Sequence, residues 1–419
     1  MLSALSNAFK VEELRNKIFF VLGMIAIYRM GAHIPVPGID AQALRELFAG
    51  EGVLGFLDMF AGGALENFAI FALSISPYIT ASIIMQLLTV AVPKLEELAK
   101  QGPEGQKIIT RYTRYATVLL GAIQGAGITL MISNLGAIRN PSFLNLSVIV
   151  ITLTAGTVFL MWLGEQITEK GIGNGISILI FVSIISRLPG ATVQTFNQLM
   201  VGALNIFNIL AFVVVAVIVV GLIVYIEEGK RKIPVRYSKR VVGRKVYGGQ
   251  STHIPMKVNQ AGVMPVIFAS SVLLFPATIA QFIQRDWAQA IARILSPNAP
   301  LYIFLFAVLI IFFTYFYTAI QFNPIDVADN MKKYGGFVPG RRPGRPTAEY
   351  LDRILTRITL AGAVFLAAVA IVPEFVIGLT GLQVRFGGTA LLIAVGVALQ
   401  TMQQIETQLL SRHYEGFMK

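Results

Sequence analysis

Long stretches without charged side chains alternate with short charged segments along this chain of 419 residues. A helix needs about 20 apolar residues to cross a bilayer, and most of the charge-free windows reach that length. Each window therefore predicts a membrane-spanning helix, and the spans at 171–186 and 358–373 are expected to be short, tilted or flanked by interfacial residues. The windows are 67–93, 115–138, 140–164, 171–186, 188–226, 258–284, 294–325, 358–373 and 386–405.

One further apolar segment, 18–28, follows a short basic lead at the N-terminus. It resembles a signal-peptide core, but residues 29–33 lack a small-x-small cleavage pattern. We therefore expect an uncleaved first span, with Arg29 near the outer interface because a charge at the midplane is costly. In the longest window we place the span at 205–226, after an external loop. The chain then has ten spans.

The segment at about 53–65, just before the second span, is too short to cross the membrane and ends near a glycine pair. Such a re-entrant segment is tolerated only where protein or an aqueous cavity surrounds it. We expect a movable plug helix that swings at its glycines; an amphipathic helix on the membrane surface is the alternative. The plug residues are Phe56, Leu57, Met59, Phe60, Gly62 and Gly63.

Composition supports the same class, because 55% hydrophobic and 13% charged residues do not fit an ordinary soluble domain. The chain has no cysteine, its three histidines are far apart, and it lacks HExxH and phosphate-loop motifs. We expect no metal, no cofactor and no enzymatic activity. An ion-coupled transporter of a small solute would hold ionisable residues inside the spans, and it remains the alternative.

The basic residues are distributed unevenly around ten spans. If the spans alternate in direction, 27 of the 34 lysines and arginines fall on the side of the two termini. The positive-inside rule places that side in the cytoplasm. Ten spans also divide into two inverted five-helix halves, 1–187 and 188–419, with a functional path between them near the midplane. We therefore expect an all-α polytopic membrane protein of this organisation.

Two loops on the basic side, 229–259 and 326–352, carry many of these charges. The first has nine basic residues and no acidic residue. Residues 235–247 alternate in polarity around Gly243, which predicts a β-hairpin. A basic loop that projects from the membrane suits ribosomal RNA phosphates; retention of the loop in the cytoplasm is the simpler alternative.

Several motifs resemble signatures of the bacterial SecY family of protein-conducting channels, in order along nearly the whole chain. They lie at 57–65, 77–86, 156–175, 255–263, 338–344 and 387–393. This resemblance implies an hourglass pore between the halves, closed by the plug and by an apolar ring. The ring would consist of Ile75, Ile79, Ile176, Ile180, Ile267 and Ile393. A narrow apolar constriction blocks ions by dewetting yet does not hold a passing chain.

The resemblance also implies a lateral gate between the second and third spans on one side and the seventh and eighth on the other. We expect polar residues there to form weak interhelical hydrogen bonds. These residues are Pro77, Thr80, Ser82, Gln86, Ser270 and Ser271. Ser74 stands where this family commonly has glycine, and we expect it to stiffen the start of the second span.

The function implied is that of the central pore subunit of the Sec translocase in the bacterial cytoplasmic (inner) membrane. It would conduct unfolded secretory polypeptides and release hydrophobic segments sideways into lipid. The implied partners are the small membrane subunits SecE and SecG, the SecA ATPase, the ribosome and signal-sequence-bearing polypeptides. The residues that would contact the motor or the ribosome are Arg240, Arg244, Lys245, Arg341 and Arg342.

Overall fold

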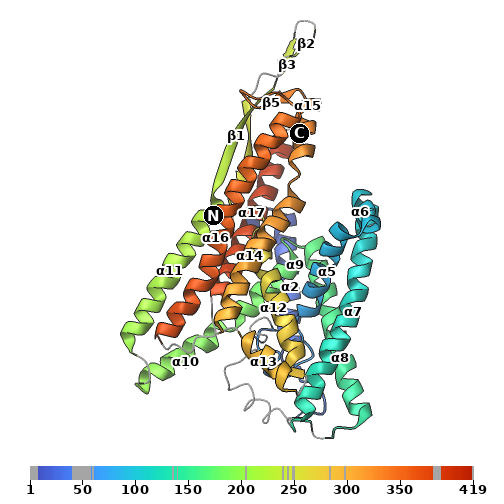
Figure 1. Ribbon diagram of the computed structural model, residues 1–419, viewed down its shortest axis with the longest axis vertical. Coiled ribbons are helices and arrows are strands. Elements are labelled where there is room, and N and C mark those ends of the chain that lie inside the picture. Colours follow the sequence, from blue (N-terminus) through green and yellow to red (C-terminus); the bar gives the residue numbers. More distant parts are fainter. Residues whose placement is uncertain are drawn as a thin grey trace.

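The computed structural model describes residues 8–417, except 40–57, 59–60, 135, 139, 203–204, 238–239, 243–244, 248–250, 283–284, 297–298 and 381–387. The predicted plug residues Phe56, Leu57, Met59 and Phe60, and the predicted partner contact Arg244, lie outside this described part. The remainder is a bundle of long helices with a β-hairpin projecting from one end (Figure 1).

Ten helices occupy the ten predicted spans. The first five are α2 (Glu12–Gly31), α5 (Ser76–Ala91), α7 (Pro103–Asn134), α8 (Phe143–Lys170) and α9 (Gly175–Ser186). The second five are α11 (Ile206–Glu228), α12 (Met264–Phe282), α14 (Pro300–Gln321), α16 (Arg345–Thr380) and α17 (Gly388–Phe417). Between them lie the shorter helices α6 (Pro93–Lys100), α10 (Leu188–Met200), α13 (Asp286–Ile294) and α15 (Pro324–Lys333).

Length and apolarity agree with this assignment. Within the described residues, seven helical stretches, in α7, α8, α9 with α10, α11, α14 with α15, α16 and α17, are long and apolar enough to cross a membrane. The bent pair of α5 and α6 counts as an eighth, and α12 is a shorter apolar helix. Together with α2, whose first turns are charged, these helices make the ten-span, all-α membrane fold that the charge-free windows predict.

The second span differs from its prediction, because its helix begins only at Ser76. Residues 61–75 instead form mostly turns, with a single β-bridge between Ala69 and Pro35. Phe68 and Ser74 have φ angles of 41° and 53°, which residues other than glycine rarely adopt. Most of this segment is buried in protein, which is the condition under which non-helical backbone is tolerated at membrane depth. At its other end α5 meets α6 at an angle of 98°.

The helices at the two short windows extend beyond them. Helix α9 has 12 residues, but together with α10 it forms one apolar stretch over Gly175–Met200. Helix α16 has 36 residues and begins at Arg345, because the charged residues before the window continue the helix instead of ending it; glutamate and arginine are good helix formers. The predicted loop 326–352 therefore contains most of α15 and the start of α16.

The helices pack as two groups that follow the chain. Helices α2, α5, α7, α8 and α9 contact one another, and α11, α12, α14, α16 and α17 do likewise. The principal contacts between the groups lie along two lines, where α9 meets α17 and where α12 meets α5 and α7. Leu14 at the start of α2 clusters with Ile405 on α17. The start of the first span and the C-terminal part of the last span therefore lie on the same side of the bundle, as an even number of spans requires.

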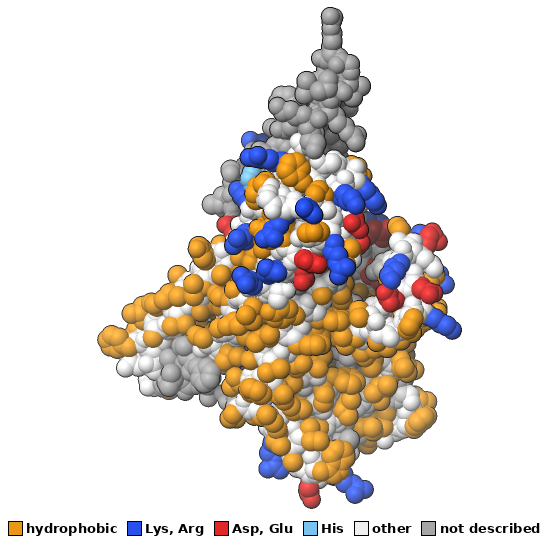
Figure 2. Space-filling view, turned by 45° about the horizontal axis from the view of Figure 1, so that its top comes forward, with side chains coloured by type: hydrophobic (Ala, Val, Ile, Leu, Met, Phe, Trp, Pro, Cys, Tyr) orange, Lys and Arg blue, Asp and Glu red, His pale blue; other side chains and the backbone are white. Residues whose placement is uncertain are grey.

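The basic loops form one structured surface. Strands β2 (Arg240–Val242) and β3 (Lys245–Tyr247) pair within the predicted hairpin 235–247. The longer strands β1 (Lys230–Tyr237) and β4 (Ser251–Lys257) also pair and extend the hairpin beyond the predicted range (Figure 1). Strand β5 (Gly336–Phe337) joins the far edge of β1, so both predicted loops belong to one sheet. Figure 2 shows lysines and arginines gathered at this end, above a belt of hydrophobic side chains. We call this the basic end and the opposite one the far end.

Close packing of the turn segment against α8 gives a first prediction. A Cβ added at Gly156 would lie 1.9 Å from the carbonyl oxygen of Ile70. Because backbone and not a flexible side chain must shift, we expect Gly156→Ala to destabilise the protein by about 1–3 kcal/mol. The measurement is the Tm of the protein purified in detergent.

Gly23→Ala in α2 is the matched control, since nothing lies within 4 Å of a Cβ added there. It should leave the Tm unchanged or raise it, because alanine favours helix by up to about 1 kcal/mol over glycine. Equal Tm values for the two variants would show that the segment does not press on α8.

Candidate functional site: a pore constriction and its outer latch

Two cavities lie one above the other between the helix groups. The inner cavity, toward the basic end, has a volume of ≈ 440 Å³ and is lined by α5 residues from Tyr78 to Thr89 and by the start of α12. The outer cavity has ≈ 30 Å³ and is lined by residues 74–79 and by later residues of α12. Ile79 and Ile180 line both cavities. These two side chains therefore form the partition between them.

The other predicted ring residues gather around this partition. Ile75 lines the outer cavity, and Ile176 and Ile267 line the inner one. Ile393 lines neither, but it is fully buried in the same apolar cluster. The structure thus brings five of the six isoleucines to the lining of the two cavities, while the place of Ile393 in the ring and the joint action of the six as a seal stay predictions.

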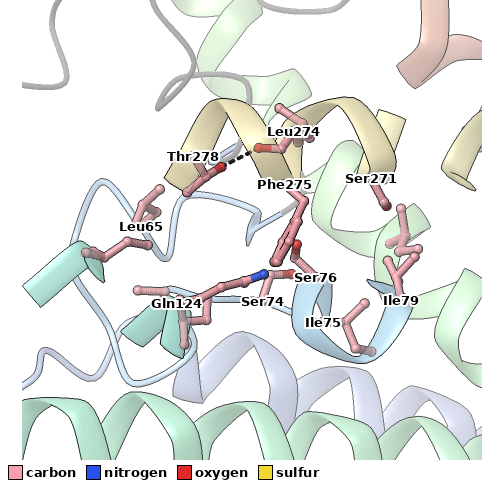
Figure 3. Close-up of a pocket in the computed structure, with 14 residues that line it drawn as sticks. Leu65, Ser74, Ile75, Ser76, Ile79, Gln124, Ser271, Leu274, Phe275 and Thr278 are labelled. Carbon is pink, nitrogen blue, oxygen red and sulfur yellow. Dashed lines mark hydrogen bonds between the residues drawn. The ribbon is translucent and has the colours of Figure 1, made fainter. Parts of the chain in front are cut away.

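The outer cavity has a polar lining that the sequence analysis missed in part (Figure 3). Gln124 on α7 is 7% exposed, and its amide points toward Ser74 and Ser76 (Figure 3). Thr278 lies across the cavity and donates a hydrogen bond to the carbonyl of Leu274 at 2.7 Å. A glutamine inside a charge-free window was the available signal, since polar residues in spans face protein more often than lipid.

The predicted gate residues lie on the packed surfaces of α5 and α12, but their hydroxyl groups bond locally. Thr80 donates to the carbonyl of Ser76 at 3.1 Å. Ser270 and Ser271 donate to the carbonyl of Ile267 at 2.9 and 2.8 Å. The prediction of interhelical donors is therefore wrong for these three, because a hydroxyl in an apolar helix reaches its own preceding turn first.

The remaining gate residues have different positions. Ser82 and Gln86 line the inner cavity. Pro77 stands in the first turn of α5, where its missing N–H leaves no helical bond unmade. Pro276, by contrast, lies inside α12. Pro77 thus starts the second span and does not break it.

At the far end, a buried ion pair holds the end of the predicted plug. Asp58 is fully buried, and its Oδ2 lies 2.6 Å from Nη2 of Arg187. Its Oδ1 accepts hydrogen bonds from the backbone N–H groups of Leu65 and Glu66, at 2.9 and 3.1 Å. Arg187 also reaches the Glu66 carboxylate at 3.2 Å. The first residue after α9 is thereby joined to both ends of segment 58–66.

A second set of contacts joins the same segment to α2. The Tyr28 hydroxyl lies 2.5 Å from Ser183 Oγ and 3.3 Å from the carbonyl oxygen of Ala61. Arg29 donates to the carbonyl of Gly62 at 3.2 Å, so it has a specific partner within the protein; its position near the outer interface stays a prediction. We call these two sets of contacts the outer latch.

The glycine pair has a packing role in this latch. Gly62 has a φ of 63°, and a Cβ added there would lie 3.0 Å from Cα of Ser183. The turn and the close approach therefore both require glycine at this position, whereas nothing lies within 4 Å of a Cβ at Gly63. Hinge motion at the pair stays a prediction.

The predicted partner contacts lie at the basic end. Arg341 and Arg342 are exposed, and the Arg341 guanidinium lies 5.1 Å from the ring centroid of Tyr350, within range of a cation–π interaction. Arg240 and Lys245 lie on β2 and β3. On β1, Ile233 and Val235 are buried while Arg231, Lys232 and Arg236 are exposed. We call the exposed basic residues of β1 and of 341–342 the basic platform.

Comparison with known proteins agrees with this architecture. The model of the SecY family matches residues 69–402. The protein translocase subunit SecY of Streptomyces scabiei is 48% identical over 441 residues, covering 100% of both chains. That of Escherichia coli K12 is 47% identical over 417 residues, covering 97% of this chain and 94% of its own.

Solved structures share the fold at lower sequence identity. A protein-conducting channel superposes with a TM-score of 0.66 at 18% identity, covering 94% of this chain and 92% of its own. Sec61 in the canine ribosome–channel complex from the endoplasmic reticulum gives a TM-score of 0.62 at 17% identity, with the same coverage. With ten spans in two packed groups, an isoleucine partition between two cavities and these full-length similarities, the chain belongs to the SecY family.

Proposed function

We propose that this chain is the pore subunit of a protein translocase and conducts unfolded secretory polypeptides across the membrane. The observation that carries the proposal is the partition at Ile79 and Ile180, which separates two cavities between the helix groups. An apolar constriction of this kind excludes ions by dewetting and offers no fixed partner to a moving chain. The names of the full-length relatives support the same activity.

The line where α12 meets α5 and α7 is the proposed lateral gate. Because Thr80, Ser270 and Ser271 donate within their own helices, separating α5 from α12 leaves none of these donors unpaired. A nascent segment of about 20 apolar residues could gain roughly 0.3–0.6 kcal/mol per residue by moving into lipid. Opening the gate therefore costs little free energy in broken hydrogen bonds, and the apolar segment that leaves gains enough transfer free energy to favour its release into lipid.

The basic platform is the proposed docking surface for the ribosome and for the SecA ATPase. Its exposed cations suit RNA phosphates, and the structural relative cited above was solved in a ribosome complex. SecE and SecG are proposed as small membrane subunits on family grounds. The excess of lysine and arginine at the basic end favours a cytoplasmic position for that end and for both termini, and the family resemblance supports the bacterial cytoplasmic (inner) membrane as the location.

The secondary-transporter alternative receives less support from the cavities. Coupling ions are bound by ionisable or polar groups near the interface of the halves. Among the described residues, no charged side chain lines either cavity. The buried charges of Asp58 and Arg187 lie at the far end, in the outer latch.

The test of the pore uses the absence of native cysteine. We expect Ile79→Cys to form a disulfide with a single cysteine in a stalled secretory precursor, in membranes supplied with SecA and ATP, because Ile79 faces both cavities. Leu119→Cys on α7 is the control, since this side chain is 63% exposed on the surface of the bundle. Cross-linking at Leu119 but not at Ile79, Ile176 or Ile267 would reject the pore assignment.

The outer latch gives a further prediction about the resting channel. Arg187→Gln leaves the Asp58 carboxylate buried without its cation, which costs about 3–5 kcal/mol in comparable ion pairs. We expect the state with the latch formed to lose stability, so that anions enter proteoliposomes faster through the unliganded channel. The measurement is the rate of iodide entry.

Two variants control this experiment. Arg293→Gln removes an exposed arginine on α13 and should leave iodide entry unchanged. Asp58→Asn combined with Arg187→Gln removes both charges and should restore part of the seal, because coupled residues are not additive. Iodide entry at the wild-type rate in Arg187→Gln would show that the latch does not hold the channel closed.

A further inference from the structure

A buried polar cluster lies where the basic hairpin joins the membrane helices. Asn259, between β4 and α12, is 1% exposed, and its amide donates to Glu227 in the last turn of α11 and to the carbonyl of Gly262 at 3.0 Å. Lys257, the last residue of β4, donates from Nζ to Oε1 of Gln403 on α17 at 2.9 Å. We call Glu227, Lys257, Asn259 and Gln403 the root cluster.

The backbone around the root cluster is held equally closely. The N–H of Val258 donates to the carbonyl of Gly229 at 2.9 Å, which ties the two legs of the hairpin together at their base. A Cβ added at Gly362 would lie 2.6 Å from the carbonyl oxygen of Val258, so α16 packs directly on this strand end. The hairpin base therefore packs on α16, while the side-chain bridges of the root cluster connect it to α11 and α17.

The same connection leads directly into the gate. A Cβ added at Gly396 on α17 would lie 2.2 Å from Cγ1 of Val263, which is the residue before α12 begins. Ile267, in the first turn of α12, lines the inner cavity. Ser270 and Ser271 follow on the proposed gate surface. A short, tightly held segment thus separates the basic hairpin from the residues that close the channel.

The polar groups of the root cluster differ from those at the gate in what they join. Thr80, Ser270 and Ser271 bond within one helix each, whereas the root cluster links a strand or loop to α11 and α17. Oδ1 of the buried Asn259 has no hydrogen-bond partner among the described residues. A buried network with an unsatisfied member is poorly optimised for stability alone, and such groups call for another explanation.

We propose that the root cluster transmits docking of a partner on the basic platform to the gate helix α12, with Lys257 and Asn259 as its positioning residues. This inference rests on the proposed function, because it requires a partner at the platform. The side-chain bridges hold the hairpin base, α11 and α17 in one arrangement, so a displaced hairpin moves the start of α12. Without the bridges, the hairpin base can flex and the displacement is lost locally.

The test measures gate response and partner binding separately, in the full chain with its partner subunits. Ser271→Cys serves as the reporter in every variant, because the chain has no other cysteine and Ser271 is 8% exposed on the outer cavity. A lipid-soluble maleimide labels it when the gate opens. We expect saturating ribosomes to accelerate labelling by at least about fivefold, the lower end of usual coupling between sites.

Lys257→Met should retain ribosome affinity and the unliganded labelling rate but lose this acceleration. Lys170→Met is the matched control, since Lys170 is an exposed lysine at the end of α8, outside the basic platform and the root cluster; it should keep the acceleration at saturation. Lys257→Arg, which can still donate to Gln403, should restore it. Lys257→Met with Gln403→Leu should behave like Lys257→Met alone, because both changes remove one interaction.

The Asn259 bridge has its own pair of variants. Glu227→Gln keeps an acceptor for the Asn259 amide and should keep the acceleration, whereas Glu227→Leu removes the acceptor and should lose it. Acceleration that persists in Lys257→Met and Glu227→Leu at unchanged affinity would overturn the inference alone. A wild-type protein that does not bind ribosomes would overturn both the proposed docking and the inference that rests on it.

Discussion

The constraint on which the structure most depends is that backbone polar groups inside a membrane must be satisfied by protein. Residues 61–75 meet this constraint without a helix. Their surroundings are correspondingly specific: α8 carries Gly156 where the Ile70 carbonyl approaches, and α2 carries Gly31 where the Phe71 ring lies. Tyr28 and Arg29 meet the carbonyls of Ala61 and Gly62. The arrangement of α2, α8 and α9 around this segment is therefore what allows a plug connection to exist at membrane depth.

Elements whose polar groups bond within a single helix can separate easily, whereas elements joined by hydrogen bonds or ion pairs tend to move together. At the gate, Thr80, Ser270 and Ser271 satisfy their donors within single helices, so the contact between α5 and α12 is largely apolar packing. In the outer latch, Asp58 and Arg187 bridge a loop and the end of α9. This bridge resists separation because Asp58 without Arg187 would be a fully buried, unpaired charge.

The sequence predicted the parts of the fold that depend on local pattern. Charge-free windows identify the ten spans because lipid excludes charge, and the alternation around Gly243 identifies the hairpin. The turns at 61–75 were not predictable in this way, because an apolar run indicates that a segment is buried but does not show that it is helical. The neighbouring sequence also gives no signal for the positive φ angles of Phe68 and Ser74. The pairing of Arg187 with Asp58, and the position of Gln124 beside Ser74, depend on helices that are distant in the sequence. Resemblance to the SecY family singled out Ile79 and Ile180, which line both cavities, and composition alone could not do this.

The two cavities indicate why opening requires two separate events. The outer cavity is narrow at ≈ 30 Å³, and Leu65 from the latched segment is part of its lining. The inner cavity is more than ten times larger at ≈ 440 Å³. A polypeptide in the inner cavity would meet the isoleucine partition first and the latched segment behind it. The two barriers are held by different contacts, because Ile79 and Ile180 belong to the packed helices α5 and α9, whereas the latched segment is fixed through Asp58 and Arg187 at the far end. Weakening the latch alone therefore loosens one barrier and admits small anions more often, but passage of a polypeptide requires that the helices at the partition and the latched segment both move.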